Sequence, residues 1–232
     1  MTPVSLSQYD CIFFDFDGVI ADSVDAKITA FGELYDEFGP EVRRAVEDYQ
    51  RAVPGETRFD KIPRFHREHL GIALSEAEIA QWCDKLSSIV LDEVVNSALL
   101  PDVPEVLAML ERQNIQAHIV SGTPHDELQI IVDRKGLAPF FRTARGAPEK
   151  KASIVRDIMA TEGLTASQCL FVGDAMTDFN CAQQCDMAFL GRSEPFGNPF
   201  PTGTCVVQRL GEYFLSDNWN GAAGSANQNR AA

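Results

Sequence analysis

The sequence predicts an α/β protein, a parallel sheet with helices on both faces, joined to a small second domain made only of helices. In the second half of the chain, short apolar runs alternate with helical segments, as strands do when crossover helices connect them. The first apolar run, residues 11–14, is followed instead by helical periodicity through about residue 96. Several apolar runs end in Asp, Ser or Gly, as strands do at the ligand-binding edge of an open sheet.

Length and charge limit the function. The 232 residues can hold one large domain or a core with a modest insertion. A net charge of −14 argues against nucleic acid or an anionic membrane as the main partner. Residues 1–10 lack the basic and apolar segments of a signal peptide, and no apolar run is long enough for a membrane span. The six cysteines show no paired spacing, so we expect a protein of the reducing cytoplasm. With nucleic acid and membranes disfavoured by the charge, the partner that we expect is a small molecule.

The first half of the chain begins with one strand and continues with helices. Breaks at Gly39-Pro40 and Pro54-Gly55, and a capping box from Ser75 to Glu78, separate the helical segments. The strand is expected at 11–14 and the helices at 24–38, 41–53, 59–70 and from 75 to the middle nineties. We therefore assign residues 19–97 to a helical insertion and residues 1–18 and 98–215 to the α/β core.

The second half of the chain supplies the rest of the sheet. Pro124 suits the first turn of a helix, with Thr123 as its N-cap. Strands are expected at 117–120, 140–144, 169–172, 187–190 and 204–207, and helices at 103–113, 124–135, 150–162 and 177–185. Residues 216–232 are rich in Asn, Gly, Ala and Ser, so we expect a disordered tail.

Carboxylates follow two of the predicted strands. Asp15 and Asp17 come directly after the first strand, and Asp174 and Asp178 follow the strand at 169–172. The carboxyl ends of parallel strands meet at one edge of the sheet, so these four groups can converge there. Repulsion among them requires a cation, and oxygen ligands of this kind suit Mg²⁺.

Hydroxyl and ammonium groups accompany the carboxylates. Ser121-Gly122-Thr123 follows the strand at 117–120, and Lys151 or its neighbour Lys150 precedes the strand that leads to Asp174. Each feature alone is more simply explained as loop polarity or a helix cap. Together they suit phosphoryl transfer, in which positioning and charge neutralisation do most of the catalysis.

These motifs resemble those of a known superfamily. Asp15-Phe-Asp17-Gly-Val, Ser121-Gly-Thr123, Lys151 and Gly173-Asp174-Ala-Met-Thr-Asp178 look, in this order, like the four motifs of the haloacid dehalogenase (HAD) superfamily. The resemblance covers about residues 9–192 and includes a helical cap inserted after the first strand. It implies a Rossmann-like HAD core and is greatest to the branch of phosphoglycolate phosphatases and β-phosphoglucomutase.

The resemblance also implies roles for individual residues. Asp15 would be the nucleophile that forms an aspartyl-phosphate, and Asp17 the general acid and base. Mg²⁺ would be held by Asp15, the backbone carbonyl of Asp17 and Asp174, with Asp178 supporting it. Lys151 and the segment Ser121, Gly122, Thr123 would bind the phosphoryl oxygens.

Sister branches of the family provide the alternatives. The branch that cleaves phosphonates lacks the second Asp of the first motif, whereas this chain has Asp17 there. Dehalogenases generally lack the full acidic set. Gly55-Glu-Thr-Arg58 resembles a turn in the cap of sugar phosphomutases, so Arg58 is a candidate to meet a second anionic group of the substrate. Gly173-Asp174, however, is typical of phosphatases.

We therefore expect a Mg²⁺-dependent phosphatase of a small phosphorylated metabolite, such as a sugar phosphate. A sugar phosphomutase is the first alternative, and a non-catalytic binding protein on a HAD scaffold is the second. The sequence carries no mark of oligomeric state.

Overall fold

The structure, a computed structural model, describes residues 9–193 and 197–216. Residues 217–232 of the tail expected at 216–232 lie outside this description, as do the first eight residues. The sheet has six parallel strands in the order β3-β2-β1-β4-β5-β6. The strands are β1 (Cys11–Phe14), β2 (Gln116–Pro124), β3 (Thr143–Ala147), β4 (Cys169–Gly173), β5 (Ala188–Arg192) and β6 (Val206–Val207).

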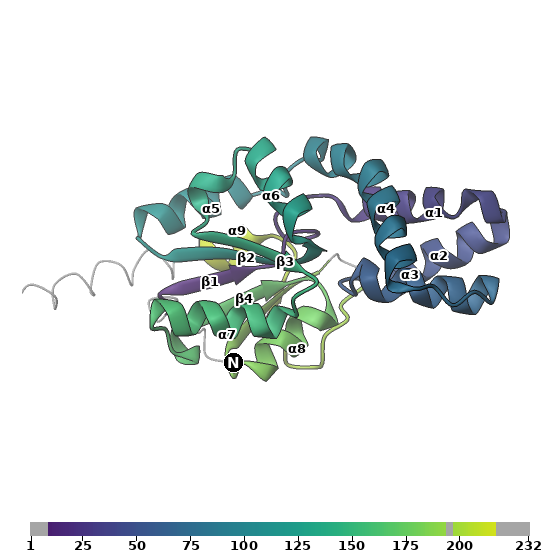
Figure 1. The fold of residues 1–232 in the computed structure, drawn as a ribbon. Coiled ribbons are helices and arrows are strands. Elements are labelled where there is room, and N and C mark those ends of the chain that lie inside the picture. The colour runs from purple at the N-terminus through teal and green to yellow at the C-terminus, as the bar shows by residue number, and fades with distance from the viewer. Residues whose placement is uncertain (1–8, 194–196, 217–232) are drawn as a thin grey trace, which may run out of the picture.

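Helices cover both faces of the sheet, as the alternating pattern predicts. Figure 1 shows α5 and α6 above the sheet and α7 and α8 below it. The helices of the core are α5 (Val103–Arg112), α6 (His125–Arg134), α7 (Lys151–Glu162), α8 (Met176–Gln184) and α9 (Leu210–Phe214), with 3₁₀ turns η4 (Ala138–Phe140) and η5 (Ala166–Gln168). The expected fold class, an α/β core with a helical cap, is confirmed.

The central strand β1 determines where the chemistry lies. Its four residues are fully buried, because helices cover both of its faces. Phe14 is aligned with Ile119 of β2 on one side and with Val172 of β4 on the other. The residues that follow these three positions therefore emerge at one edge of the sheet.

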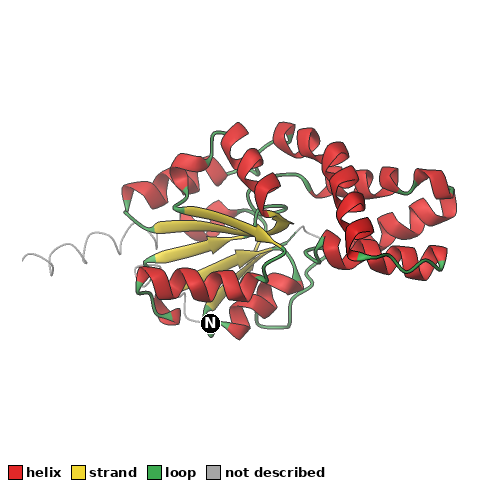
Figure 2. Cartoon of the chain, viewed as in Figure 1, coloured by secondary structure: helices red, strands yellow, loops and turns green. Residues whose placement is uncertain are grey.

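The helical insertion follows the turn after β1. It comprises α1 (Val24–Leu34), η2 (Asp36–Phe38), α2 (Pro40–Ala52), α3 (Arg58–Phe65), η3 (His66–Leu70) and α4 (Glu76–Asn96). Figure 2 shows these helices gathered at one end of the sheet, and below they are called the cap. Tyr35, Phe65 and Trp82 form the centre of its aromatic interior. The capping box of Ser75 and Glu78 is present at the start of α4.

Some predicted boundaries are wrong. The helix expected at 24–38 ends at Leu34 and is followed by a separate 3₁₀ turn. The strand expected at 140–144 begins only at Thr143, because residues 138–140 form a 3₁₀ turn that contains Pro139. Thr123 is not an N-cap, because β2 continues to Pro124 and α6 begins at His125. Helix α9 was not predicted.

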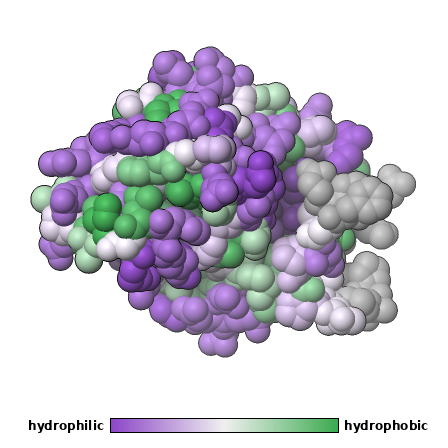
Figure 3. Space-filling model, turned by 90° about the vertical axis from the view of Figure 1, so that its right-hand side faces the viewer, coloured by the Kyte–Doolittle hydropathy of each residue, from purple (hydrophilic) through white to green (hydrophobic). Residues whose placement is uncertain are grey.

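The surface of the cap end is mostly hydrophilic, with hydrophobic side chains gathered in one area of that face (Figure 3). None of the helices in residues 9–193 and 197–216 combines the length and the apolar character that a bilayer crossing requires.

A lysine is enclosed in the cap interior. Lys61 is fully buried, and its Nζ donates to Oε1 of Gln50 over 2.6 Å and lies 5.8 Å from the centre of the Phe31 ring. Burial lowers the pKa of Lys61 to about 8, against the opposing effect of Glu56. The charged form of Lys61 is therefore costly in the folded protein.

We expect Lys61→Met to change how stability depends on pH. Between pH 8 and 10.5 the unfolded chain binds more protons at Lys61 than the folded chain, so the free energy of unfolding of the wild type rises with pH. The rise is about 3 kcal/mol, from 1.36 kcal/mol per pKa unit. The free energy of unfolding of Lys61→Met lacks this rise. Urea unfolding from pH 7 to 10.5 should therefore show that the free energy of unfolding of the variant minus that of the wild type decreases by this amount. Lys85→Met, an exposed lysine, is the control, and an equal change there would contradict the assignment.

Candidate active site

The first motif turns sharply at the end of β1. The backbone N–H of Asp15 still donates to the carbonyl of Val172 in β4, and Oδ1 of Asp15 accepts from the N–H of Phe16 over 2.7 Å. Gly18 has φ +73°, and a Cβ at this position would lie 2.3 Å from Oδ2 of Asp174. Glycine is therefore needed both for the turn and for the close approach of Asp174.

Lys151 lies between two carboxylates. Its Nζ is 2.9 Å from Oδ1 of Asp15 and 2.6 Å from Oδ1 of Asp178; both carboxylates are buried, and the lysine side chain is 10% exposed. Burial alone would lower the pKa of Lys151, but the charges of Asp15 and Asp178 raise it above its ordinary value. The neighbouring Lys150 is exposed at the start of α7, so Lys151 is the lysine that the structure brings to the carboxylates.

Asp15, Asp174 and Asp178 form an acidic cluster. Each offers a carboxylate oxygen, and these oxygens lie within 4.8 Å of one another. Burial, together with the charge of Asp178, raises the pKa of Asp15 to about 7 despite Lys151. Burial and the charges of Asp15 and Asp178 raise the pKa of Asp174 well above its ordinary value. Converging carboxylates that resist ionisation are the donor set that a hard divalent cation stabilises, so these residues fit Mg²⁺.

Asp178 already has partners for both carboxylate oxygens. Oδ1 receives Lys151, and Oδ2 accepts from the backbone N–H of Ala175 over 3.1 Å. A Cβ on Gly173 would lie 2.2 Å from the Cβ of Asp178, so glycine permits this packing. Asp174, by contrast, is only partly buried and lines the pocket described below.

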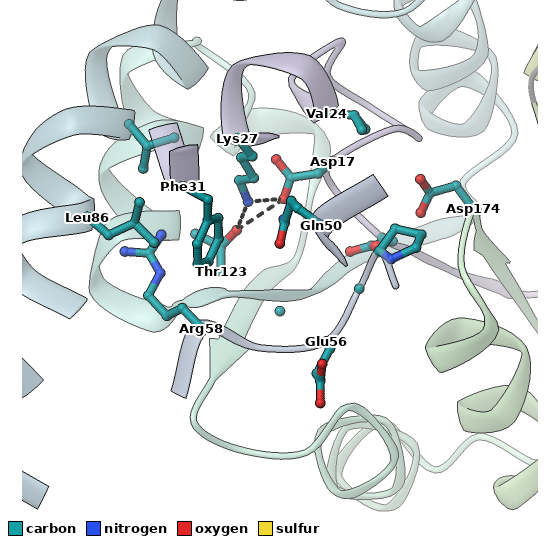
Figure 4. Close-up of a pocket in the computed structure, with 15 residues that line it drawn as sticks. Asp17, Val24, Lys27, Phe31, Gln50, Glu56, Arg58, Leu86, Thr123 and Asp174 are labelled. Atoms are coloured by element: carbon teal, nitrogen blue, oxygen red, sulfur yellow. Dashed lines mark hydrogen bonds and ion pairs between the residues drawn. The ribbon is translucent and has the colours of Figure 1, made fainter. Parts of the chain in front are cut away.

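Asp17 is held by three side chains. Ser23 donates to Oδ1 over 2.6 Å, while Lys27 and Thr123 both reach Oδ2, the latter at 3.1 Å (Figure 4). Burial alone would raise the pKa of Asp17, but Lys27 and the hydrogen bonds from Ser23 and Thr123 outweigh it and hold the pKa below its ordinary value. Asp17 is therefore ionised in this arrangement.

Lys27 was missed by the sequence reasoning. Its Nζ ion-pairs with Asp17 and donates to Oγ1 of Thr123 over 2.7 Å, so α1 of the cap contacts both motifs of the core. The sequence feature that could have indicated Lys27 is its position in the first helix after the Asp15–Asp17 motif, ten residues beyond Asp17.

Part of the Ser121-Gly122-Thr123 segment lies beside Asp17. Gly122 and Thr123 line the pocket, while the Ser121 side chain is fully buried and its Oγ accepts from the N–H of Thr123 over 3.1 Å. The structure thus brings Thr123 to Asp17. Ser121 is not among the residues that line the pocket, and its hydroxyl is bonded to the backbone of the same segment.

Arg58 reaches the pocket wall from the first turn of α3, but its guanidinium is bound. Its two terminal nitrogens donate to the two carboxylate oxygens of Glu127 over 2.9 and 2.8 Å, and Ser87 donates to the same carboxylate over 2.5 Å. Glu127 lies on α6 of the core, and both side chains are 5% exposed. Sequence reasoning proposed Arg58 for the substrate and did not find Glu127.

One pocket joins these groups. The core supplies Asp15, Asp17, Gly122, Thr123 and Asp174, and the cap supplies Val24, Lys27, Phe31, Gln50, Pro54, Gly55, Glu56, Arg58, Leu86 and Val90. In Figure 4, Asp174 lies at one end and Leu86 and Arg58 at the other. Gly55 (φ +79°) makes the close approach of cap to core, since a Cβ there would lie 2.2 Å from Oγ1 of Thr177.

Several known proteins are similar to this chain. The phosphoglycolate phosphatase of Pseudomonas savastanoi pv. phaseolicola is 26% identical over 196 residues, which span 82% of this chain and 71% of that protein. The phosphoglycolate phosphatase of Synechococcus elongatus is 23% identical over 175 residues, 75% of this chain and 78% of that protein. The fold is similar to that of CbbY from Rhodobacter sphaeroides in complex with xylulose-(1,5)bisphosphate, with a TM-score of 0.72, 16% identity, and 88% and 96% of the two chains covered.

The sequence profile of the family described as haloacid dehalogenase-like hydrolase matches residues 12–191, which include all four motifs and the whole cap. The chain therefore belongs to the haloacid dehalogenase-like hydrolase family.

Proposed function

We propose that this protein is a Mg²⁺-dependent phosphatase that hydrolyses a small phosphomonoester through an aspartyl-phosphate on Asp15. The observation that carries the proposal is the position of Asp15. Its carboxylate lies in the acidic cluster, 2.9 Å from Lys151, and Asp15 lines a pocket together with Asp17 and Thr123. A nucleophile, a fixed cation and a metal-binding donor set therefore share one place.

The side chains divide the reaction between them. An oxygen of Asp15 attacks phosphorus and the bond to the leaving oxygen breaks, while Asp17 gives that oxygen a proton. Water then attacks the phosphoryl group, Asp17 takes up a proton, and Asp15 is released. Mg²⁺ held by Asp15, Asp174 and the backbone carbonyl of Asp17, with Asp178 beside it, would neutralise phosphoryl charge.

Lys27 keeps Asp17 ionised when no substrate is present. Asp17 can take up the proton that it must donate only when the effect of Lys27 is reduced. A phosphoryl group beside Lys27 brings the negative charge that offsets it.

The cap selects the leaving group in this proposal, with residues 19–97 as the cap and residues 1–18 and 98–215 as the core. The names of the relatives make 2-phosphoglycolate the first phosphomonoester to test. A sugar phosphomutase is less well supported, because Arg58, the residue expected to hold a second phosphate, already pairs with Glu127. We place the enzyme in the cytoplasm.

The test is phosphate release from a panel of phosphomonoesters by the purified chain. We expect turnover in Mg²⁺, loss of at least 100-fold after chelation with EDTA, and recovery when Mg²⁺ is restored, because the acidic cluster repels a phosphoryl group in the absence of a cation. Binding of Mg²⁺ should also raise the melting temperature. Turnover that survives complete chelation would exclude the metal, and isomerisation of a sugar phosphate faster than phosphate release would favour the mutase.

A further inference from the structure

The pocket contains few cations, and all of them have partners. Among the pocket residues in the described part of the chain, the basic ones are Lys27 and Arg58. Lys27 ion-pairs with Asp17, and Arg58 with Glu127. Lys61 lies behind Gln50, fully buried, and donates to its side-chain oxygen.

The Arg58–Glu127 pair is enclosed and has the geometry of a strong interaction. Two parallel N–H···O bonds join the fork of Arg58 to the carboxylate of Glu127, and Ser87 donates to the same carboxylate. If Arg58 turned to an anionic ligand, Glu127 would remain buried without its counter-charge, which is strongly unfavourable. Arg58 is therefore not available to bind an anionic group of a substrate.

The rest of the distal wall favours a ligand without charge. Phe31 and Leu86 lie on the side of the pocket where Arg58 stands (Figure 4), and Val90 adds further apolar surface to the pocket wall. Besides Lys27 and Arg58, the cap wall carries the carboxylate of Glu56. This carboxylate accepts from the hydroxyl of Tyr49 and pairs with Arg64 at 3.2 Å. A second anionic group on the substrate would lose its water here and gain no cation.

We propose that Glu127 is a specificity-determining residue: by holding Arg58, it restricts the enzyme to phosphomonoesters whose leaving group carries no second negative charge. The inference rests on the phosphatase function proposed above. It separates this chain from enzymes that act on phosphorylated acids, because the carboxylate of such a substrate would meet Glu56 and an arginine whose charge Glu127 already balances.

The test compares two probes of equal length, 2-hydroxyethyl phosphate and 2-phosphoglycolate, with the full chain in Mg²⁺. For the wild type we expect kcat/KM to be at least tenfold higher for 2-hydroxyethyl phosphate. A smaller ratio, or a preference for 2-phosphoglycolate, would overturn the proposal. This comparison needs no variant, so it decides even if a substitution at position 127 impairs folding.

Glu127→Gln should free the charge of Arg58 while keeping the size of the side chain. We expect the ratio of the two kcat/KM values to shift at least tenfold toward 2-phosphoglycolate, and the shift to disappear in the double variant Glu127→Gln/Arg58→Gln. Asp126→Asn removes the same charge from an exposed neighbour on α6 and should leave the ratio unchanged. A folded Glu127→Gln with the wild-type ratio, or a shift that persists without Arg58, would exclude the mechanism.

Failure of the inference can be told from failure of the function. Phosphate release that depends on Asp15 but favours 2-phosphoglycolate would refute the role of Glu127 alone. No release that depends on Asp15 from any phosphomonoester would refute both.

Discussion

Replacing Asp15 with Asn is expected to reduce kcat/KM for phosphate release by a factor on the order of 10⁴ or more, because the amide cannot form the acyl phosphate. Asn keeps the size of the side chain and an oxygen that can accept from the N–H of Phe16. It also removes one charge from the acidic cluster, where burial already raises the pKa of Asp15 to about 7. The melting temperature without metal should therefore not fall.

Steady-state kinetics and thermal melts on the same preparation separate these effects. Asp10→Asn makes the same change at the exposed residue that precedes β1, at the opposite end of the strand, and should keep wild-type turnover. If Asp15→Asn retained normal turnover with any substrate, Asp15 would not be the nucleophile.

Replacing Lys151 with Met is expected to reduce both activity and stability. Its ammonium is the shared counter-ion of Asp15 and Asp178, which are both buried. Without it, two buried carboxylates face each other unpaired, and we expect a loss of about 3–5 kcal/mol in the free energy of unfolding near pH 8 in EDTA. The loss of a cation beside the phosphoryl group should reduce kcat by about 10²- to 10³-fold.

The stability deficit of Lys151→Met should grow as pH rises. The pKa of Asp15, raised to about 7 in the wild type, rises further without Lys151, so the folded variant binds more protons than the unfolded chain. Its stability therefore falls as pH rises from 5 to 8. The stability of the wild type falls in the same way up to about pH 7, where its Asp15 loses the extra proton, so the deficit is smallest below pH 7 and grows from pH 7 to 8. Lys150→Met, on the exposed neighbour, should change neither quantity. Equal losses in the two variants would contradict the assignment of Lys151.

Much of the core of the site could be predicted because it is encoded locally. Asp15, Asp17 and Asp174 follow buried strands directly, so the order of a parallel sheet is enough to bring them to one edge. The role of Lys151 came from a resemblance in spacing, and the structure places its ammonium between Asp15 and Asp178.

The cap contacts could not be predicted in the same way. Arg58 and Glu127 are 69 residues apart, and they meet only because the cap docks against the core, where α4 contacts α6. Thr123 was expected to cap a helix, but its hydroxyl is used by Asp17, 106 residues away. Pairings of this kind depend on the orientation of two domains, which the periodicity of a single chain does not encode.

Apart from Lys27 and Arg58, which pair with core residues, the cap side and the core side of the pocket can change independently. The side chains proposed for phosphoryl chemistry stand on the sheet, where a substitution disturbs a buried network of carboxylates. Phe31, Leu86 and Val90 stand on helices α1 and α4 of the cap and line the pocket. Evolution, or a laboratory selection, can therefore explore new leaving groups by changing the cap wall while the reaction itself is inherited intact.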